Sequence, residues 1–379
     1  MDKNFNIPSV AMSLQRKEDL NNNFSTIVDY AVKNRPDIFL ISGDVFDRVS
    51  PTNSARVFLT REMRTLKEAA IPVFIIGGNH DISKVGQSPS LAIDVLSSAG
   101  LATVFSRSDV IQRQTVSIGG RRVCIAGKSY FTQFEGANPL TGFDIPFDGD
   151  YNILMLHASL QGLNVVSSNP EIASQNPFMA EDIKKDVNYL ALGHFHNHFE
   201  RTYKECTIVN PGSIEKLSWA EINDPKGFAW VELKRSDVNV DFIELETRPM
   251  ERARLTLSKD TNYDSTIREY IVEYLSKLAD QEKIFKLTTQ GVISQDQYKQ
   301  LKVNEILQAC RNMFFHLELD RSELEVEGYG RIFSERIENP LAAFTKRIDT
   351  LIESEGKDEQ RQLLEQVKQL GIKYLEAAQ

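Results

Sequence analysis

The chain has 379 residues, a formal net charge of −9 and 41% hydrophobic residues. This length favours two or three domains, and the apolar fraction is sufficient for folded cores. The acidic balance offers no global basic surface for nucleic acid, although a local patch or a metal-filled cleft is compatible with it. Cys124, Cys206 and Cys310 lie far apart and form no CxxC pair, which favours a reduced cytosolic compartment over secretion. No apolar run is long enough to span a bilayer.

Short apolar runs alternate with amphipathic segments in the first part of the chain, which is typical of an α/β domain. Residues 1–18 show no clear period and are expected to be irregular, and Pro36 ends the helix that follows them. Parallel strands that are buried on both faces have wholly apolar sequences. Two such apolar runs, at 38–42 and 72–76, are each followed by a polar turn that contains glycine. The expected elements are helices at 19–34, 54–69 and 88–98 and strands at 38–42 and 72–76.

After Val110 the pattern is that of strands joined by turns, beginning with a hairpin around Gly119 and Gly120. Together with the preceding helices and strands, these segments predict an α/β fold, a two-sheet sandwich of the α/β/β/α type, over residues 1–234. Its functional site is expected at the carboxyl ends of the strands. Further strands are expected at 152–156, 189–192, 207–209 and 227–233, the last of which closes the sheet.

The remainder of the chain divides into two parts. Residues 235–327 predict a small α+β capping domain, with helices at 264–279 and 297–313 between strands. Residues 328–379 predict a linker and a C-terminal pair of amphipathic helices. The apolar stripes of these two helices are the best candidates for docking of a partner helix. The first stripe consists of Leu341, Phe344, Ile348 and Leu351, and the second of Leu363, Leu364, Val367, Leu370 and Tyr374.

Five polar turns, each after an apolar run, contain the residue types that bind metal ions. Five of the six histidines lie in or beside these turns. Carboxylates, an Asn carbonyl and neutral imidazoles suit Mn²⁺, Zn²⁺ or Fe, and the lack of thiolates argues against a structural zinc site. His198 is interpreted as a solvated residue or one that supports a ligand, and His316 as a strand residue that alternates with Phe315 and Leu317. The candidate ligands for one or two ions are Asp44, Asn79, His157, His194 and His196.

These residues together suit the hydrolysis of a phosphoester. One carboxylate such as Asp44 can bridge two ions, and two ions roughly 3.5–4 Å apart clamp the attacking and leaving oxygens. His80 follows Asn79 and is expected at the rim of the ions, where it can protonate the departing alkoxide or stabilise the phosphate charge. Asp81 is a candidate to orient a histidine. Each of these residues, taken alone, more often has a purely structural role. Five structural roles would have to coincide at five strand ends, so the joint pattern favours a metal site.

The blocks Gly-Asp-Val-Phe-Asp, Gly-Asn-His-Asp, Leu-His-Ala and Gly-His-Phe-His resemble those of the calcineurin-type metallophosphoesterases. The later block Asn-Pro-Gly-Ser, the capping domain and the terminal helices narrow the resemblance to the SbcD/Mre-eleven family of DNA double-strand-break repair nucleases. The likeness covers nearly the whole chain. It implies a Mn²⁺-dependent exonuclease and endonuclease that acts on DNA ends, as a homodimer, with an SbcC-type coiled-coil ABC ATPase. Such a protein is expected in the cytoplasm, associated with the nucleoid.

The resemblance also implies a role for each candidate. His80 would be the catalytic histidine, the helices at 54–69 and 88–98 would form the dimer, and the terminal helices would dock the ATPase. Residues 1–234 would be the nuclease domain and residues 235–327 the DNA-binding cap. The implied ligands are Asp44 for both ions, Asn79, His157 and His194 for one ion, and His196 for the other.

Two features depart from the family pattern. The family begins with a strand that carries Asp-x-His, which supplies two ligands to one ion, and nothing similar precedes the first predicted helix here. One ion site is therefore expected to be incomplete and the sheet to lack a strand. A truncated start, which we favour, a neighbouring segment in its place, or a weakened enzyme would each account for this. Asp47 stands where many relatives have a histidine; it is expected either to contact a ligating histidine or to cap the next turn.

Two alternative functions remain open from the sequence. Another metallophosphoesterase, acting on small phosphodiesters, would share the metal-binding turns but would need neither a cap nor terminal helices. A non-catalytic or weakened scaffold that binds DNA ends is compatible with the absence of the Asp-x-His ligands.

Overall fold

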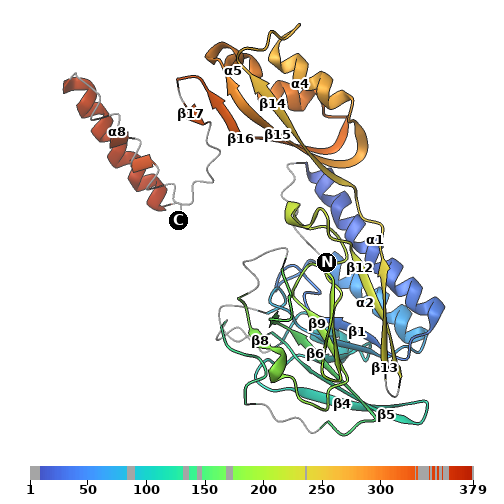
Figure 1. The fold of residues 1–379 in the computed structure, drawn as a ribbon. Helices are drawn as coiled ribbons and strands as arrows, with labels where there is room; N and C mark the ends of the chain where they lie inside the picture. Colours follow the sequence, from blue (N-terminus) through green and yellow to red (C-terminus); the bar gives the residue numbers. More distant parts are fainter. Residues whose placement is uncertain are drawn as a thin grey trace. The chain divides into compact units, whose positions relative to one another are not determined.

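The computed structural model describes residues 9–82, 90–130, 136–142, 147–167, 174–234, 237–328, 330–331 and 358–377, with positions 341, 344, 345, 348, 349 and 352. It divides into two compact units, Met1–Met250 and Glu251–Gln379 (Figure 1). None of the helices in the described ranges combines the length and the apolar character that crossing a bilayer requires.

The first unit begins with three helices, each of which is followed by a strand of one parallel sheet. The strands are ordered β1-β2-β3 across the sheet. Their bounds are Phe39–Ser42 for β1, Val73–Ile76 for β2 and Thr103–Phe105 for β3. The helices that precede them are α1 (Val10–Asn34), α2 (Asn53–Glu68) and α3 (Asp94–Ser98).

A second, mixed sheet of six strands has the order β10-β11-β9-β6-β5-β4. Its strands are β4 (Gln112–Ile118), β5 (Arg121–Lys128), β6 (Tyr151–His157), β9 (Tyr189–Gly193), β10 (Phe199–Tyr203) and β11 (Cys206–Asn210). A short pair, β7 (Ser159–Gln161) and β8 (Pro177–Met179), and the 3₁₀ turn Ala180–Asp182 cover its outer side. The predicted hairpin around Gly119 and Gly120 is confirmed as β4 and β5.

Alternation of side chains along the strands builds the two cores of the sandwich. In β2, Val73 and Ile75 pack with the helices, whereas Phe74 and Ile76 pack against the six-stranded sheet. All four side chains are buried, as expected for a parallel strand covered on both faces. The predicted α/β sandwich of two sheets is therefore confirmed.

Helix α1 begins earlier than the sequence predicted. The described part of the segment that was expected to be irregular is helical from Val10. The apolar period was hidden because Arg16 and Asn23, although polar, are buried on the inner face of this helix. Both side chains contact Glu215, which is itself buried. Such paired inward polar residues look like surface positions in a sequence.

Strand β12 (Gly227–Lys234) pairs only with β13 (Asp237–Glu244) among the described strands, as a separate antiparallel ribbon. The prediction that the segment at 227–233 closes the sheet is therefore wrong. The sequence showed an apolar alternating strand but not its partner. The described part of the helix predicted at 88–98 is also shorter than expected, because only Asp94–Ser98 is helical.

The second unit contains a four-stranded sheet in the order β14-β15-β16-β17. The helix predicted at 297–313 is two short helices, because Lys302 adopts a positive φ of 37° between them. Most of the first predicted terminal helix lies outside the described residues. The elements are β14 (Met250–Ser258), α4 (Ile267–Ser276), β15 (Asp280–Ile293), α5 (Gln295–Leu301), α6 (Val303–Ala309), β16 (Phe314–Val326), β17 (Gly330–Arg331) and α8 (Asp358–Ala377).

Truncating a side chain at the centre of the core of the second unit should destabilise that unit. Phe285 is fully buried and stacks on Phe314, so Phe285→Ala is expected to lower the free energy of unfolding by about 3–5 kcal/mol. Val292 lies on the same strand but is 40% exposed, and Val292→Ala should change stability by at most about 0.5 kcal/mol. Hydrogen exchange of peptides from residues 251–328 measures both effects. Equal losses for the two variants would contradict the position of this core.

Candidate metal centre

Four predicted ligands meet where strands of the two sheets end. Asp44 follows β1 and Asn79 follows β2, while His157 is the last residue of β6 and His194 follows β9. The strand pairs β1·β2 and β6·β9 are each parallel, so their carboxyl ends lie at a common edge. The sequence prediction that these turns come together is borne out by their side-chain contacts.

The four side chains form a chain of close contacts between potential ligand atoms. His157 Nε2 lies 3.2 Å from Asp44 Oδ2 and 3.0 Å from Asn79 Oδ1. His194 Nδ1 lies 3.2 Å from Asn79 Oδ1 and 3.3 Å from His157 Nε2. One carboxylate oxygen, one amide oxygen and two ring nitrogens therefore converge on one position. We refer to Asp44, Asn79, His157 and His194 as the ligand cluster.

The hydrogen bond at Nδ1 of His157 determines which ring nitrogen faces the cluster as an acceptor. His157 Nδ1 lies 2.8 Å from the carbonyl oxygen of Ser42, which can only accept a hydrogen bond. In the neutral ring Nδ1 therefore carries the proton and Nε2 presents a lone pair to the cluster. The oxygens of Asp44 and Asn79 that face it are also acceptors. In this neutral form of His157, its Nε2 and the two oxygens all face the cluster as acceptors, which favours a cation at their centre.

The spacing of the cluster fits a metal ion. Adjacent donor atoms around an ion bound at about 2.1 Å lie about 3.0 Å apart in octahedral coordination. The contacts within the cluster span 3.0–3.3 Å. In the part of the chain that the structure describes, no three His, Cys, Asp or Glu side chains suffice on their own to hold an ion. The amide oxygen of Asn79 contacts both histidines and would add a fourth donor to Asp44, His157 and His194.

Two glycines allow the loops to approach this closely. A Cβ atom on Gly78 would lie 2.1 Å from Asp44 Oδ1 and 2.4 Å from the Asp44 amide nitrogen. Gly43 has a positive φ of 96°, and a Cβ there would lie 2.3 Å from His157 Nδ1. Asp44 and His194 themselves have positive φ, which costs free energy and is held by the surrounding contacts.

Asp81 ties the first two loops together beneath the cluster. Its buried carboxylate accepts hydrogen bonds from the amides of Val45, Phe46 and Gly78 at 3.0–3.1 Å. Burial and the nearby Asp44 charge raise its pKa to about 6, although these amides lower it. The sequence suggested that Asp81 orients a histidine, whereas these contacts show that it orients the backbone on either side of Asp44 and Asn79.

Asp44 is the anion of the cluster. Burial raises the pKa of Asp44, but the charge and hydrogen bond of His157, with a contribution from His80, outweigh burial and hold this pKa well below its usual range. Burial lowers the pKa of His157, but Asp44 more than offsets this, so that the pKa of His157 is raised. The site therefore presents a carboxylate at neutral pH.

His80 lies at the rim of the cluster, as the sequence predicted. Its backbone amide donates to Asp44 Oδ1 at 3.0 Å, while its ring Nδ1 lies 3.1 Å from the carbonyl oxygen of Asp47. The Asp47 carboxylate is 3.9 Å from the same nitrogen. The side chain of His80 is 41% exposed and can meet a substrate. The histidine that Asp47 contacts here is therefore His80, which is not one of the predicted ligands.

His196 lines the same groove as Asp44 and His194 but is held by a separate group of residues. Its Nδ1 lies 3.0 Å from Glu221 Oε1, and Glu221 Oε2 accepts from Lys226 Nζ at 2.8 Å. No pattern in the sequence pointed to Glu221 and Lys226, which follow the Asn-Pro-Gly-Ser block among ordinary polar residues. A Glu and a Lys buried as a pair give no periodic signal, so only the fold reveals them.

The two remaining histidines have the structural roles that the sequence indicated. His198 Nδ1 lies 3.1 Å from the carbonyl oxygen of Asn210, and its ring stacks on Phe242 with centroids 4.1 Å apart. His316 lies on β16 in the second unit and is half-buried. Neither belongs to the ligand cluster.

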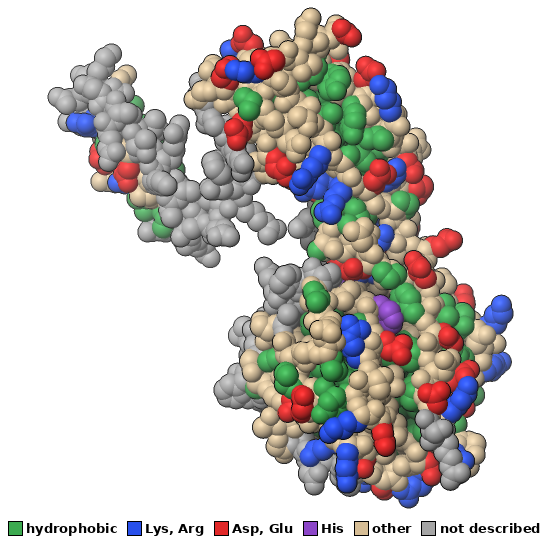
Figure 2. Space-filling view, in the orientation of Figure 1, with side chains coloured by type: hydrophobic (Ala, Val, Ile, Leu, Met, Phe, Trp, Pro, Cys, Tyr) green, Lys and Arg blue, Asp and Glu red, His purple; other side chains and the backbone are tan. Residues whose placement is uncertain are grey.

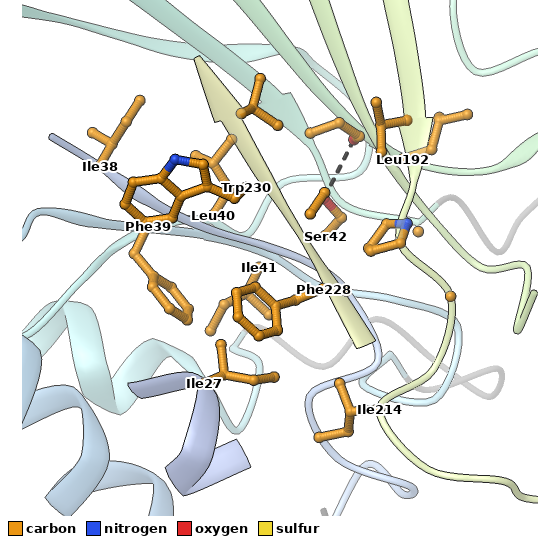
Figure 3. A pocket seen from close by; sticks show the side chains of 18 of the residues that line it. Ile27, Ile38, Phe39, Leu40, Ile41, Ser42, Leu192, Ile214, Phe228 and Trp230 are labelled. Atoms are coloured by element: carbon orange, nitrogen blue, oxygen red, sulfur yellow. Dashed lines mark hydrogen bonds between the residues drawn. The ribbon is translucent and has the colours of Figure 1, made fainter. Parts of the chain in front are cut away.

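A long groove leads to this site along β1. It has a volume of about 780 Å³ and is lined by apolar side chains of α1, β1 and β12. Figure 3 shows side chains such as Ile27, Ile41 and Phe228 around a common space. Among the described strands, β1 pairs only with β2, so its other edge faces this groove. The groove continues to Asp44 and His196.

Substitution of Gly78 by alanine should disrupt the ligand cluster. Gly78→Ala is expected to abolish stoichiometric binding of Mn²⁺ and to lower stability, because the added Cβ overlaps Asp44 and neither loop can withdraw. Gly136→Ala is the matched control, since a Cβ at Gly136 has nothing within 4 Å. Isothermal titration calorimetry measures the binding. Undiminished binding in Gly78→Ala would contradict the ligand cluster.

The acid stability of the chain should depend on Glu221. Burial raises its pKa, but the hydrogen bond from His196 and the charge of Lys226 lower it from 4.5 to about 2. An acid with a lowered folded-state pKa stabilises the fold above its unfolded value and loses that contribution as pH falls through the folded value. This amounts to at most about 3 kcal/mol between about pH 4.5 and pH 2. Glu221→Gln should therefore flatten the dependence of unfolding free energy on pH in this window, measured by urea denaturation. An unchanged slope would show that Glu221 is not held as described.

Comparison with known proteins confirms the resemblance seen in the motifs. The calcineurin-like phosphoesterase family model matches residues 17–198. The uncharacterized metallophosphoesterase YhaO of Bacillus subtilis is 25% identical over 253 residues, which are 66% of this chain and 59% of that protein. The DNA double-strand break repair protein Mre11 of Aeropyrum pernix is 25% identical over 249 residues, which are 64% of this chain and 59% of that protein.

The SbcD component of the nuclease SbcCD of Staphylococcus saprophyticus is 23% identical over 308 residues, 77% of this chain and 79% of that protein. The chain thus spans less than two thirds of the length of the first two relatives and more of the third. Residues 17–198 match the calcineurin-like phosphoesterase family, which is hydrolytic and uses a dimetal centre, and the chain is similar to Mre11 proteins and to the SbcD component of a nuclease.

Proposed function

We propose that this chain is a Mn²⁺-dependent DNA exonuclease and endonuclease subunit that processes DNA ends in double-strand-break repair. The observation that carries this proposal is the convergence of the ligand cluster beside the exposed ring of His80. A metal centre next to an acid–base group suits hydrolysis of a phosphodiester. The names of two relatives, a DNA double-strand break repair protein and a nuclease component, point to DNA as the substrate.

Bound ions would polarise the phosphate and supply a hydroxide nucleophile at neutral pH. Asp44, Asn79, His157 and His194 would hold one ion, and Asp44 with His196 would contribute to a second. Mn²⁺ accepts this mixture of oxygen and imidazole ligands. The fixed tautomer of His157 and the amide contacts of Asp81 hold the ligands in place before any ion binds.

His80 is the residue that would assist the leaving group. Its Nδ1 donates to the Asp47 carbonyl, which fixes the ring and directs Nε2 away from that contact. The Asp47 carboxylate lies 3.9 Å from the same Nδ1, so both Asp47 contacts are on the side of the ring opposite Nε2. Protonation of the departing alkoxide from this position is worth about 10²–10⁴-fold in rate.

Contact with DNA would be local. Figure 2 shows acidic and basic side chains interspersed on the visible face of the first unit, and the chain carries a formal net charge of −9. Binding to a phosphate backbone under these conditions depends on a few basic groups and weakens with salt. We propose the second unit as the DNA-binding cap and residues 328–379 as a linker with helices for a partner.

The proposed partner is an SbcC-type ABC ATPase with a coiled coil. Helix α8 supports this assignment because it exposes apolar side chains along one stripe. These are Leu363 (59% exposed), Val367 (43%), Leu370 (57%) and Tyr374 (70%). We further propose a homodimer through α2 and α3, which expose Val57 (69%) and Val95 (51%).

A weakened or non-catalytic scaffold is the second candidate, and the small number of ligands at the second ion site favours it. The groove along β1 bears instead on how that site could be completed. Asp44 and His196 alone are too few ligands for a second ion, and the nuclease family has an Asp-x-His strand for this purpose. The groove lies between β1 and β12, each of which has one strand partner among the described strands. We propose that one strand fits between these two edges and brings the missing ligands to Asp44 and His196.

Digestion of a blunt linear duplex in Mn²⁺ tests the proposal. The assay compares the chain as it stands with a version that carries an Asp-x-His strand ahead of Met1. The completed version should cut, and His80→Gln in that background should reduce the rate by about 10²–10⁴-fold while Mn²⁺ binding is kept. Asn79→Ala should abolish both, because its oxygen bridges His157 and His194.

Two outcomes would count against the nuclease. Cleavage of bis-p-nitrophenyl phosphate without cleavage of the duplex would indicate an enzyme for small phosphodiesters. If neither version cuts, even with the ATPase present, and Asn79→Ala leaves DNA binding unaltered, the scaffold is the better description.

A further inference from the structure

The loop that carries His194 and His196 is held by its backbone carbonyls. Asn210 Nδ2 donates to the carbonyls of Phe195 and Asn197, each at 2.8 Å. The His196 carbonyl between them accepts from the Ser213 amide at 3.0 Å and from Lys226 Nζ at 2.8 Å. Three successive carbonyls are therefore fixed, two of them by one Asn side chain.

The Asn-Pro-Gly-Ser block supplies most of these donors. Asn210 and Ser213 are its first and last residues. Gly212 lies between them with a positive φ of 82°, and a Cβ there would lie 2.7 Å from the His196 carbonyl oxygen. A glycine is needed at this point because the two backbones touch. The block thus serves to clamp the loop that presents His196.

Glu221 holds the side chain of His196 as firmly as the block holds its backbone. Oε1 of Glu221 contacts His196 Nδ1 and accepts from Ser218 Oγ, both at 3.0 Å. Oε2 of Glu221 accepts from three donors and so cannot turn toward the ring. These donors are Lys226 Nζ at 2.8 Å, the Leu217 amide at 3.2 Å and Ser213 Oγ at 3.3 Å.

Both charged members of this group are buried. Glu221 and Lys226 are each 1% exposed, and the ammonium contacts both the carboxylate and the His196 carbonyl. Burying two charges is costly unless their hydrogen bonds are satisfied. A buried, hydrogen-bonded ion pair therefore supports His196, the predicted ligand that does not belong to the ligand cluster.

We propose that Glu221 is a positioning residue that holds His196 in the tautomer with Nδ1 protonated, so that Nε2 is available to the second metal ion. A carboxylate can only accept, so the ring must donate from Nδ1. Carboxylate–histidine pairs of this kind fix the ring and strengthen it as a ligand. Lys226 and the Asn-Pro-Gly-Ser block hold the backbone in the matching position. The role of His196 toward an ion rests on the proposed function, whereas its tautomer does not.

A purely structural ion pair would behave differently from a positioning residue. In Glu221→Gln, the three donors around Oε2 would select the amide oxygen for that position. The amide NH₂ would then face His196 Nδ1, which must accept, and the proton would move to Nε2. The substitution is isosteric, so it changes the tautomer while it keeps the shape of the site.

The tautomer can be measured by ¹⁵N NMR of histidine-labelled, metal-free protein above pH 7, with His196 assigned by the signal that disappears in His196→Gln. The native chain should show Nδ1 protonated and Nε2 bare, and Glu221→Gln should reverse this pattern. Nε2 protonated in the native chain would overturn the proposal. If Glu221→Gln fails to fold because Lys226 is left without a counter-charge, the native spectrum still decides, and Glu221→Gln with Lys226→Met restores charge balance.

Metal binding provides the second readout. In the version that carries the Asp-x-His strand ahead of Met1, calorimetric titration with Mn²⁺ should show the affinity at His196 lowered about 10–100-fold in Glu221→Gln, with the ion at the ligand cluster unaffected. Glu215→Gln is the matched control, because Glu215 is also fully buried but contacts Arg16 and Asn23 instead. An equal loss in both variants would indicate general destabilisation and contradict the positioning role. If the native chain binds no metal but has the expected tautomer, the proposed function fails and the assignment of Glu221 stands.

Discussion

The hydrogen bond from His157 Nδ1 to the Ser42 carbonyl joins the two sheets at the edge where the metal centre lies. His157 ends β6 of the six-stranded sheet, and Ser42 ends β1 of the parallel sheet. The bond fixes the tautomer of the histidine and brings the Gly-Asp turn under its ring. Gly193 shows how close this approach is, because a Cβ there would lie 2.0 Å from the same carbonyl oxygen. The ligand cluster depends on this junction.

Around this junction, several polar side chains are buried and need hydrogen-bond partners within the protein. Asp81 accepts backbone amides from two loops beneath Asp44, and Glu221 with Lys226 supports the loop of His196. Each of these buried groups has hydrogen-bond partners, which is the condition under which burial of charge is tolerated. The result is a set of candidate ligands held in place by carbonyls, amides and two carboxylates, in addition to the contact between Asp44 and His157.

The ligands could be predicted from the sequence because each follows an apolar strand, and parallel strands end at one edge. Asp44, Asn79, His157 and His194 needed only this rule to be placed together. Glu221 and Lys226 could not be found this way, since their partners are set by loops of irregular structure. The start of α1 was missed for a similar reason: Arg16 faces inward because Glu215, about two hundred residues away, neutralises it. Strand β12 was recognised, but its pairing with β13 depended on a partner strand that the pattern did not show.

The proposed nuclease activity requires that the ligand cluster binds a metal ion. Anomalous diffraction from crystals soaked in Mn²⁺, collected at the manganese edge, would locate such an ion. We expect a peak bonded to Asp44 Oδ2, Asn79 Oδ1, His157 Nε2 and His194 Nδ1, with bonds of roughly 2.0–2.3 Å. A cluster without a peak at millimolar Mn²⁺, or a peak bound elsewhere in the first unit, would show that these four side chains are not a metal site.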